Sequence, residues 1–235
     1  MRNLKQYISY LQKWSKQIIN GAHCSGVVVG LSGGVDSAVV ANLLCDTTKV
    51  YGVWINIDSA KEDYECVQLL KKQKKFVVVD LDLTTTYKAL VKTLKITNKL
   101  GLINLKVRMR MLSLYALAQE KKCLVAGTSN LDELYLGYFT KYGDGASDFA
   151  PLAKLNKNEV WELAKLLNVP QQIITRAPSA GLYAGQSDEK DMGVTYKEID
   201  AYLSNKPINP KAKKIIDKLH KMNLHKSSLS IKPKK

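Results

Sequence analysis

A run of small and polar residues separates two apolar stretches, 27–29 and 38–44, near the start of the chain. The run consists of Gly30, Leu31, Ser32, Gly33, Gly34, Val35, Asp36 and Ser37. A buried strand, a tight turn and the first turn of a helix are expected in this order. Such a turn directs unpaired backbone N–H groups and the positive end of the helix dipole toward an anion. The run therefore predicts a phosphate-binding loop; the alternative is a plain turn whose glycines only allow close packing.

The same loop differs from the Walker phosphate loop, which places a lysine in the pattern G-x-x-x-x-G-K-[ST]. Asp36 stands in the first helical turn instead. A carboxylate beside a polyphosphate is repelled unless a divalent cation lies between the two groups. The presence of Asp36 therefore predicts that Mg²⁺ accompanies the phosphates.

Apolar, β-branched runs alternate with helical patterns along the chain. We expect strands at 27–31, 50–55, 76–81 and 123–126. We expect helices at 4–19, 36–45, 62–72, 84–94, 104–120, 131–138, 157–167, from 195 onward and at 210–224, with Asn104, Asn156 and Thr195 as N-caps. Polar loops are expected at 141–148 and 177–193. The alternation predicts an α/β fold with a doubly wound, Rossmann-like parallel sheet flanked by helices.

The order of the strands decides which residues meet. In the common doubly wound order 3-2-1-4, the first and fourth strands are neighbours, and a crevice opens between their carboxyl ends. Asp36 follows the first strand, while Thr128 and Glu133 follow the fourth. We therefore expect Asp36 and Glu133 to share Mg²⁺ on a bound triphosphate, with Thr128 touching the ligand. Taken alone, Glu133 is also explained as an ordinary surface acid.

Positive side chains are expected to complete such a site, because phosphoryl and nucleotidyl transfer depends on positioning and charge neutralisation. Arg108 lies in the helix expected from residue 104, Lys141 opens a polar loop, and Lys157 begins a capped helix. Asp148 closes the loop that Lys141 opens. Solvated surface positions are the alternative explanation for each of the three cations.

The net charge of +15 is unevenly distributed. Residues 206–235 contain ten lysines and one acid, so this end carries +9 and the rest of the chain +6. A moderately basic body suits polyanionic small molecules at least as well as nucleic acid. We expect no nucleic-acid partner, and a flexible basic tail at 227–235.

The chain of 235 residues is expected to form one domain, 1–235. No apolar run reaches membrane-spanning length, and the first residues lack the hydrophobic region of a signal peptide. Four widely spaced cysteines without a C-x-x-C pair favour reduced thiols. These features predict a cytoplasmic protein with no membrane partner.

The stretch 32–37 resembles the pyrophosphate loop of the adenine-nucleotide alpha hydrolases, which cleave ATP between its α- and β-phosphates. The loop alone does not choose among the members of that superfamily. Five later stretches resemble ammonia-dependent NAD synthetases in the same order, namely 104–111, 137–145, 177–180, 186–189 and 193–196. The sequence Tyr-Phe-Thr-Lys-Tyr-Gly-Asp-Gly at 138–145 is highly specific, and the resemblance extends over nearly the whole chain.

This resemblance implies a role for each matched residue. It assigns ATP to Gly30 through Ser37, Thr128, Lys157 and Ser179, Mg²⁺ to Asp36 and Glu133, and deamido-NAD to Arg108, Lys141, Asp148, His225 and Lys226. It places Asp36, Asp148 and Lys157 in the chemistry. Asp148 is one candidate base that takes a proton from ammonium; the alternatives are that its carboxylate orients the nicotinate ring or binds ammonium. In the family the enzyme is a homodimer with the dinucleotide at the subunit interface.

The implied reaction converts deamido-NAD to NAD through an adenylated intermediate, with ATP as co-substrate and free ammonia as nitrogen source. No glutaminase domain is expected. A tRNA-modifying ATP pyrophosphatase and a non-catalytic nucleotide sensor are the alternatives. Ser129 and Asn130 stand where many members have Asp-His, Ser179 replaces a frequent threonine, and the tail lacks the family's aromatic-acidic ending.

Overall fold

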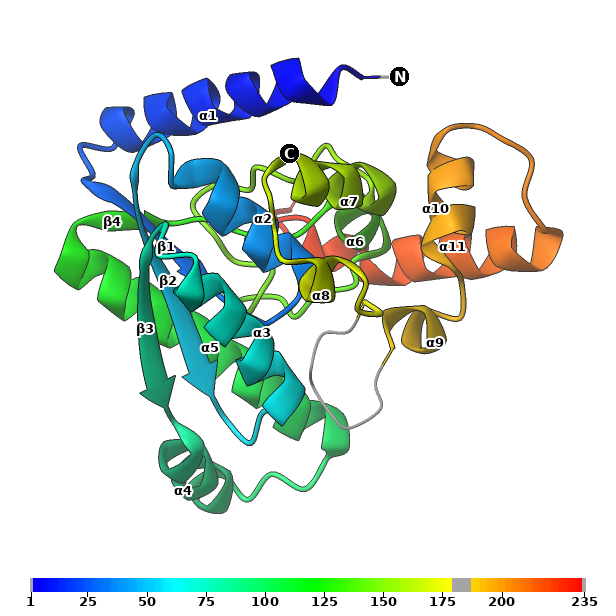
Figure 1. The fold of residues 1–235 in the computed structure, drawn as a ribbon. Coiled ribbons are helices and arrows are strands. Elements are labelled where there is room, and N and C mark those ends of the chain that lie inside the picture. Colours follow the sequence, from blue (N-terminus) through cyan, green and yellow to red (C-terminus); the bar gives the residue numbers. More distant parts are fainter. Residues whose placement is uncertain (1, 179–186, 234–235) are drawn as a thin grey trace.

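A four-stranded parallel sheet forms the centre of the computed structural model, which describes residues 2–178 and 187–233 (Figure 1). Its strands are β1 (Gly26–Gly30), β2 (Lys49–Asn56), β3 (Val77–Asp82) and β4 (Cys123–Val125). They lie in the order β3-β2-β1-β4, which confirms the predicted order. Val28 of β1 pairs with Val125 of β4 and with Tyr51 of β2. The carboxyl ends of β1 and β4 are therefore adjacent.

Helices cover both faces of the sheet, because the side chains of its central strand are buried on both sides. One face packs against α4 (Thr84–Leu94) and α5 (Lys99–Lys121), where Val28 and Val125 contact Leu114 and Ala118. The other face, with Val27 and Val29, packs against α1 (Leu4–Gly21), α2 (Val35–Leu44), α3 (Lys61–Lys72), α7 (Lys157–Leu166) and α8 (Gln171–Ile174). The expected α/β fold with a doubly wound parallel sheet is confirmed.

A further group of helices packs beside the sheet around its own apolar centre. It comprises α6 (Leu131–Leu136), α9 (Asp188–Met192), α10 (Tyr196–Leu203) and α11 (Pro210–Asn223), followed by the 3₁₀ turn η1 (Leu224–Lys226). Tyr196, Ile199 and Ile216 are buried between these helices. In Figure 1, α10 and α11 extend away from the sheet, while α6 lies beside α7.

Two expected boundaries are wrong. Helix α5 begins at Lys99, with Asn98 as its N-cap, so Asn104 does not start the helix. Its side-chain oxygen instead accepts a hydrogen bond of 2.7 Å from the Thr140 hydroxyl. The loop expected at 177–193 contains α9. The expected capping boxes at Asn156 and Thr195 are confirmed.

Among the described residues, 2–178 and 187–233, no helix combines the length and the apolar character that crossing a membrane demands.

Gly33 is the loop position at which a side chain would be least tolerated. Its φ is +81°, and a Cβ there would lie 2.6 Å from the carbonyl oxygen of Asp63. We expect Gly33→Ala to lower the free energy of unfolding by about 1–3 kcal/mol, because the backbone is strained and the loop must move away from α3. Gly21→Ala is the matched control, since a Cβ at Gly21 meets no described atom within 4 Å. Urea unfolding compares the two, and equal stability would contradict this account of the loop.

Candidate active site

A cavity of about 830 Å³ opens at the carboxyl ends of β1 and β4. Residues from the glycine loop, the turn after β4, α5 and the C-terminal helices line it. Its walls include the following predicted residues: Gly30, Leu31, Ser32, Gly34, Val35, Asp36, Ser37, Arg108, Thr128, Glu133, Lys141, Lys157, His225 and Lys226. The cavity lies where an open α/β sheet of this order places its ligand.

Hydrogen bonds within the glycine loop hold its shape. The Ser32 N–H donates to the Ser37 hydroxyl oxygen at 3.2 Å, and the Gly34 N–H donates to the Ser32 hydroxyl oxygen at 3.2 Å. The Ser37 hydroxyl in turn donates to the Gly34 carbonyl at 3.0 Å. Gly34 is the N-cap of α2 and makes no side-chain cap bond, so the first turn of α2 presents its N–H groups to the cavity without a side-chain acceptor. This arrangement suits a phosphate group.

A buried lysine joins the two predicted carboxylates. Lys157 Nζ forms an ion pair with Asp36 Oδ2 and lies 3.9 Å from Glu133 Oε1. The Lys157 side chain is 3% exposed, and both carboxylate side chains are 17% exposed. Asn130 Nδ2 donates to the other oxygen of Asp36 at 3.0 Å. The structure thus brings Asp36 and Glu133 to one cation, although 97 residues of sequence separate them.

Burial and mutual charge set the protonation of this group. Burial raises the pKa of Glu133 well above its usual range, and the neighbouring Asp36 carboxylate raises it further. Burial acts to lower the pKa of Lys157, but Asp36 and Glu133 outweigh this effect, and the net pKa is raised. Lys157 therefore stays charged at neutral pH.

The donor set around Asp36 and Glu133 fits Mg²⁺ if the ion also binds the phosphates of a nucleotide. In the described part of the chain, no cluster of three or more His, Cys, Asp or Glu side chains forms a complete metal site. Mg²⁺ commonly binds one or two protein carboxylates and completes its shell with water and substrate phosphate oxygens. The Lys157 ammonium marks a place where one cation reaches both Asp36 and Glu133. The residues therefore fit an ion that is shared with the phosphates of a bound nucleotide.

The residues predicted to contact deamido-NAD form a second wall of the cavity. Arg108 Nε donates to the Lys141 carbonyl at 3.1 Å, and Lys141 Nζ donates to the His225 carbonyl at 2.8 Å. Lys226 Nζ donates to the carbonyls of Gly137 and Phe139 at 2.8 and 2.9 Å. These bonds connect α5, the loop that begins at residue 137 and η1. The Lys226 ammonium therefore shapes the wall, whereas Arg108 is exposed.

Two predicted residues in the described part of the chain, Gly33 and Asp148, do not line this cavity. Asp148 is exposed and does not line it; its Oδ2 accepts a bond of 2.7 Å from the Val125 N–H, and its Oδ1 accepts one of 3.4 Å from the Tyr115 hydroxyl. Its loop therefore turns the carboxylate toward β4 and α5. Ser179 lies outside the described residues.

Several cavity or supporting residues were missed by sequence reasoning. Asn130 completes a capping box with Glu133, a pattern visible in the sequence as N-x-x-E. Asp144 lines the cavity and accepts a bond of 2.8 Å from the Thr140 N–H. Asp63 and Arg176 form an ion pair of 2.6 Å on the side of α3. No local sequence pattern identifies this pair, because its two residues meet only through tertiary packing.

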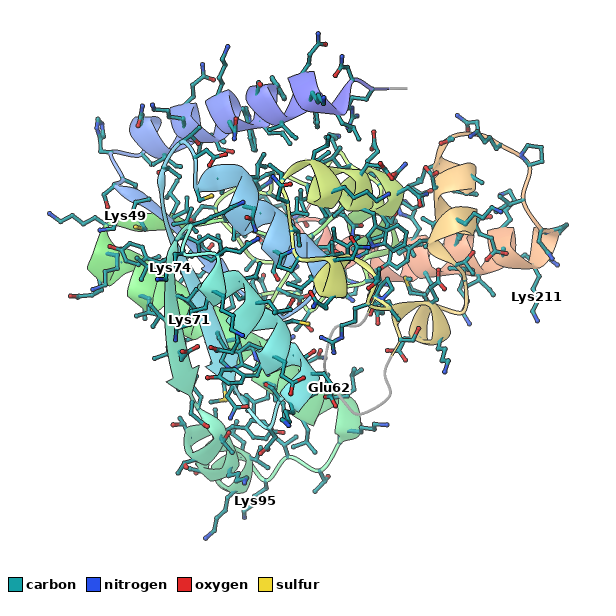
Figure 2. The ribbon with its side chains drawn as sticks, viewed as in Figure 1. Lys49, Glu62, Lys71, Lys74, Lys95 and Lys211 are labelled. Atoms are coloured by element: carbon teal, nitrogen blue, oxygen red, sulfur yellow. The ribbon has the colours of Figure 1, made fainter. Side chains whose placement is uncertain are left out.

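The remaining positive charge lies largely on the outside. Figure 2 shows Lys49, Lys95 and Lys211 at the edge of the molecule. Lys71 is paired with Asp80 at 2.6 Å, and its side chain is still 47% exposed. The buried Lys157 differs from these surface lysines, because the carboxylates of the site compensate the desolvation of its ammonium.

A glycine loop after β1, a shared acidic pair and a buried lysine at the sheet switch point define an α/β enzyme that uses a nucleoside phosphate. The model of the NAD synthase family matches residues 7–230 of the chain. The chain belongs to the NAD synthase family, whose members are carbon–nitrogen ligases. The motif resemblance to that family is thereby confirmed.

Individual relatives agree over almost the full length. The chain is 46% identical to an NH₃-dependent NAD(+) synthetase of Mycoplasmopsis pulmonis, covering 99% of this chain and 92% of the relative. It is 43% identical to the corresponding protein of Mesoplasma florum, with 98% and 97% covered. The tRNA-modifying alternative is not favoured by these similarities.

Solved structures confirm the fold. An NMN synthetase of Francisella tularensis is 38% identical with a TM-score of 0.95, and 99% of each chain is covered. An NH₃-dependent NAD synthetase of Campylobacter jejuni is 26% identical with a TM-score of 0.84, covering 99% of this chain and all of the other.

Proposed function

We propose that this chain amidates deamido-NAD with ammonia and ATP, releasing NAD, AMP and pyrophosphate. The observation that carries the proposal is the Lys157 ammonium between Asp36 and Glu133, at the rim of the glycine loop. A triphosphate on the loop places its phosphates against this cluster. The match to the NAD synthase family over residues 7–230 supports the choice of reaction.

In the first step, a nicotinate carboxylate oxygen attacks the α-phosphorus of ATP. The bond from that phosphorus to the bridging oxygen breaks, and pyrophosphate leaves. The N–H groups of the glycine loop and the Lys157 ammonium stabilise the negative charge that develops on the phosphates. The product is a mixed anhydride, in which AMP is a far better leaving group than an oxide.

In the second step, ammonia attacks the acyl carbon of the anhydride, the carbon–oxygen bond to AMP breaks, and ammonia loses a proton. Asp36 and Glu133 are the residues that would hold Mg²⁺. When bound, this ion supplies Lewis-acid polarisation of the phosphate oxygens and charge neutralisation. The dinucleotide part of the site would be lined by Arg108, Lys141, His225 and Lys226. The ATP part would be lined by Thr128 and Ser179.

The test is turnover by the purified chain. We expect NAD and AMP in equal amounts from deamido-NAD, ATP, Mg²⁺ and ammonium. Absence of NAD with active, folded protein would contradict the proposal. Release of AMP only in the presence of RNA would indicate a tRNA-modifying enzyme, and nucleotide binding without turnover would indicate a sensor.

A second acceptor belongs in the same assay. The structural similarity to an NMN synthetase, with a TM-score of 0.95, favours nicotinate mononucleotide as a competing substrate. The ratio of kcat/KM for the dinucleotide and the mononucleotide decides between the two. A higher value for the mononucleotide would replace deamido-NAD as the principal substrate.

We also propose a homodimer with the dinucleotide near the interface. The outer face of α5 supports it, since Leu112 is 71% exposed and Tyr115 is exposed one turn further along the helix. Asp148 contacts Tyr115 on this face, so a partner subunit seated there would bring a dinucleotide site near Asp148. The enzyme is proposed to work in the cytoplasm, in keeping with the free thiols of Cys24, Cys45, Cys66 and Cys123.

The dimer proposal predicts the behaviour of one surface variant. We expect Leu112→Lys to shift the chain from dimer to monomer, because it places charge on the apolar face of α5 without disturbing the core. Light scattering after size exclusion measures the mass. Leu94→Lys is the control, since Leu94 is 54% exposed at the end of α4. A wild-type monomer, or a Leu112→Lys dimer, would contradict this interface.

A further inference from the structure

Asp132 is a completely buried acid next to the candidate active site. It is 0% exposed and lies in the first turn of α6, one residue before Glu133. Its Oδ2 accepts a hydrogen bond of 2.8 Å from the backbone N–H of Lys157, the first residue of α7. Beside this bond, the Leu131 N–H donates to the Leu155 carbonyl at 2.8 Å. Two hydrogen bonds therefore join the start of α6 to the start of α7.

The consequence is that residues 130–133 hold three parts of the site in register. The Asn130 amide bonds to Asp36, Asp132 bonds to the backbone of Lys157, and Glu133 faces the Lys157 ammonium. Asp36, Glu133 and Lys157 come from three different helices, α2, α6 and α7. Their mutual distances depend on how α7 docks against α6. Asp132 is the side chain that fixes this docking at Lys157 itself.

The capping box of α7 does not reach the Lys157 N–H, so Asp132 supplies the acceptor for this N–H from a neighbouring helix. The Asn156 side chain accepts from the Glu159 N–H at 2.8 Å, and the Glu159 carboxylate accepts from the Asn156 N–H at 3.1 Å. Burying a further carboxyl group is unfavourable. Within the described residues, Asp132 Oδ1 has no hydrogen-bond partner. Asp132 is thus a buried acid that is unfavourable to bury. The hydrogen bond of its Oδ2 goes to the backbone of Lys157, the residue that carries the ammonium of the site.

We propose that Asp132 is a positioning residue of the ligase reaction, which holds the backbone of Lys157 so that its ammonium meets Asp36 and the ATP phosphates. The proposal rests on the proposed function of the site. It concerns the acceptor oxygen and the Lys157 N–H, and it requires no contact between Asp132 and substrate. A displacement of reacting groups by about 1 Å is enough to slow an enzyme about a hundredfold.

The test compares Asp132→Ala with Asp132→Asn. We expect Asp132→Ala to lower kcat by about 10- to 100-fold with an unchanged KM for ammonia, because the Lys157 N–H loses its acceptor. Asp132→Asn keeps an oxygen at the same place and should retain most of kcat. Glu159→Gln is the matched control. Like Asp132→Ala it removes one negative charge, here from the first turn of α7, but it leaves the hydrogen bond at the Lys157 N–H intact.

Three outcomes would overturn the proposal: wild-type kcat in Asp132→Ala, an Asp132→Asn variant as slow as Asp132→Ala, or a Glu159→Gln variant equally impaired. If Asp132→Ala does not fold, Asp132→Ser replaces it, because the shorter side chain withdraws the acceptor and leaves a polar group. A wild-type chain that makes no amidated product contradicts the proposed function instead. Thermal unfolding of each variant separates lost stability from lost kcat.

Discussion

Asp36→Ala should yield a folded protein in which the first step, measured as the rate of pyrophosphate release, has slowed by at least about 10³-fold. The loss is expected because Asp36 is one of two carboxylates proposed to hold Mg²⁺ on the phosphates and because it fixes the Lys157 ammonium. Rapid measurement of pyrophosphate release in the presence of deamido-NAD reports this first step alone, because AMP leaves only in the second step, when the amide forms. A wild-type rate of this step in Asp36→Ala would contradict the proposal that Asp36 holds Mg²⁺ on the phosphates.

The fold should survive this substitution for an electrostatic reason. With Asp36 absent, the buried Lys157 ammonium still has Glu133 as a partner at 3.9 Å, and the pair is neutral overall. Removal of the Asp36 charge also removes one of the causes that raise the pKa of Glu133, so Glu133 ionises more readily and pairs better. Circular dichroism should therefore show the wild-type fold, with a lower Tm because the buried ion pair of Lys157 with Asp36 is lost.

Asp46→Ala supplies the matched control for this experiment. Asp46 follows the opposite end of α2 and is exposed, so its removal takes one negative charge from the same part of the chain without touching the cavity. We expect full activity and unchanged stability. A loss of activity in both variants would point to a general charge effect rather than to the site.

Sequence reasoning was most successful where the signal is local. The β-branched runs and the glycine loop predicted the strands. The common doubly wound strand order, taken as the expected one, then predicted the meeting of Asp36 with Glu133, because strand ends in a parallel sheet share one edge. The capping box at Asn156 and Glu159 likewise located the start of α7. These features depend on spacing and residue type over a few positions.

The features that sequence reasoning missed depend on how elements distant in the sequence pack against one another. The helix start was placed at Asn104 instead of Asn98, because both are good N-caps and the intervening Leu100 is largely exposed, which weakens the apolar pattern there. The contact between Asp36 and Lys157 spans 121 residues and is set by the packing of α7 on α2. Asp148 turns toward β4 because the Val125 N–H needs an acceptor, which spacing in the loop does not reveal.

Lys157→Met is expected to have the largest combined effect on stability and activity. Methionine fills a similar volume but leaves Asp36 and Glu133 without their buried cation. Removing one partner of a buried ion pair costs about 3–5 kcal/mol. For a domain of this size, that loss lowers Tm by roughly 6–20 °C. The rate of AMP formation should fall by at least about 10³-fold, because the developing phosphate charge loses its ammonium.

Lys165→Met is the control for this prediction. Lys165 lies on the same helix, pairs with Glu162 at 2.7 Å and has a 56% exposed side chain. Exposed pairs of this kind contribute about 0–1 kcal/mol. Unfolding of the two variants should therefore differ by several kcal/mol. Equal stability would show that the buried cluster is not held together by charge.

The pH dependence gives an independent check on Lys157→Met. A carboxyl group whose pKa is raised in the folded protein binds more protons there than in the unfolded chain, so stability increases as pH falls through the raised pKa toward the ordinary value. Burial and Asp36 already raise the pKa of Glu133, and loss of Lys157, which lowers it, raises it further. The stability deficit of Lys157→Met should therefore be greatest at alkaline pH and shrink on acidification. Adding Glu133→Gln to Lys157→Met should restore stability and remove most of this pH dependence, while activity stays lost. A stability deficit of Lys157→Met that does not change with pH would mean that Lys157 stabilises the fold by packing and not by its charge.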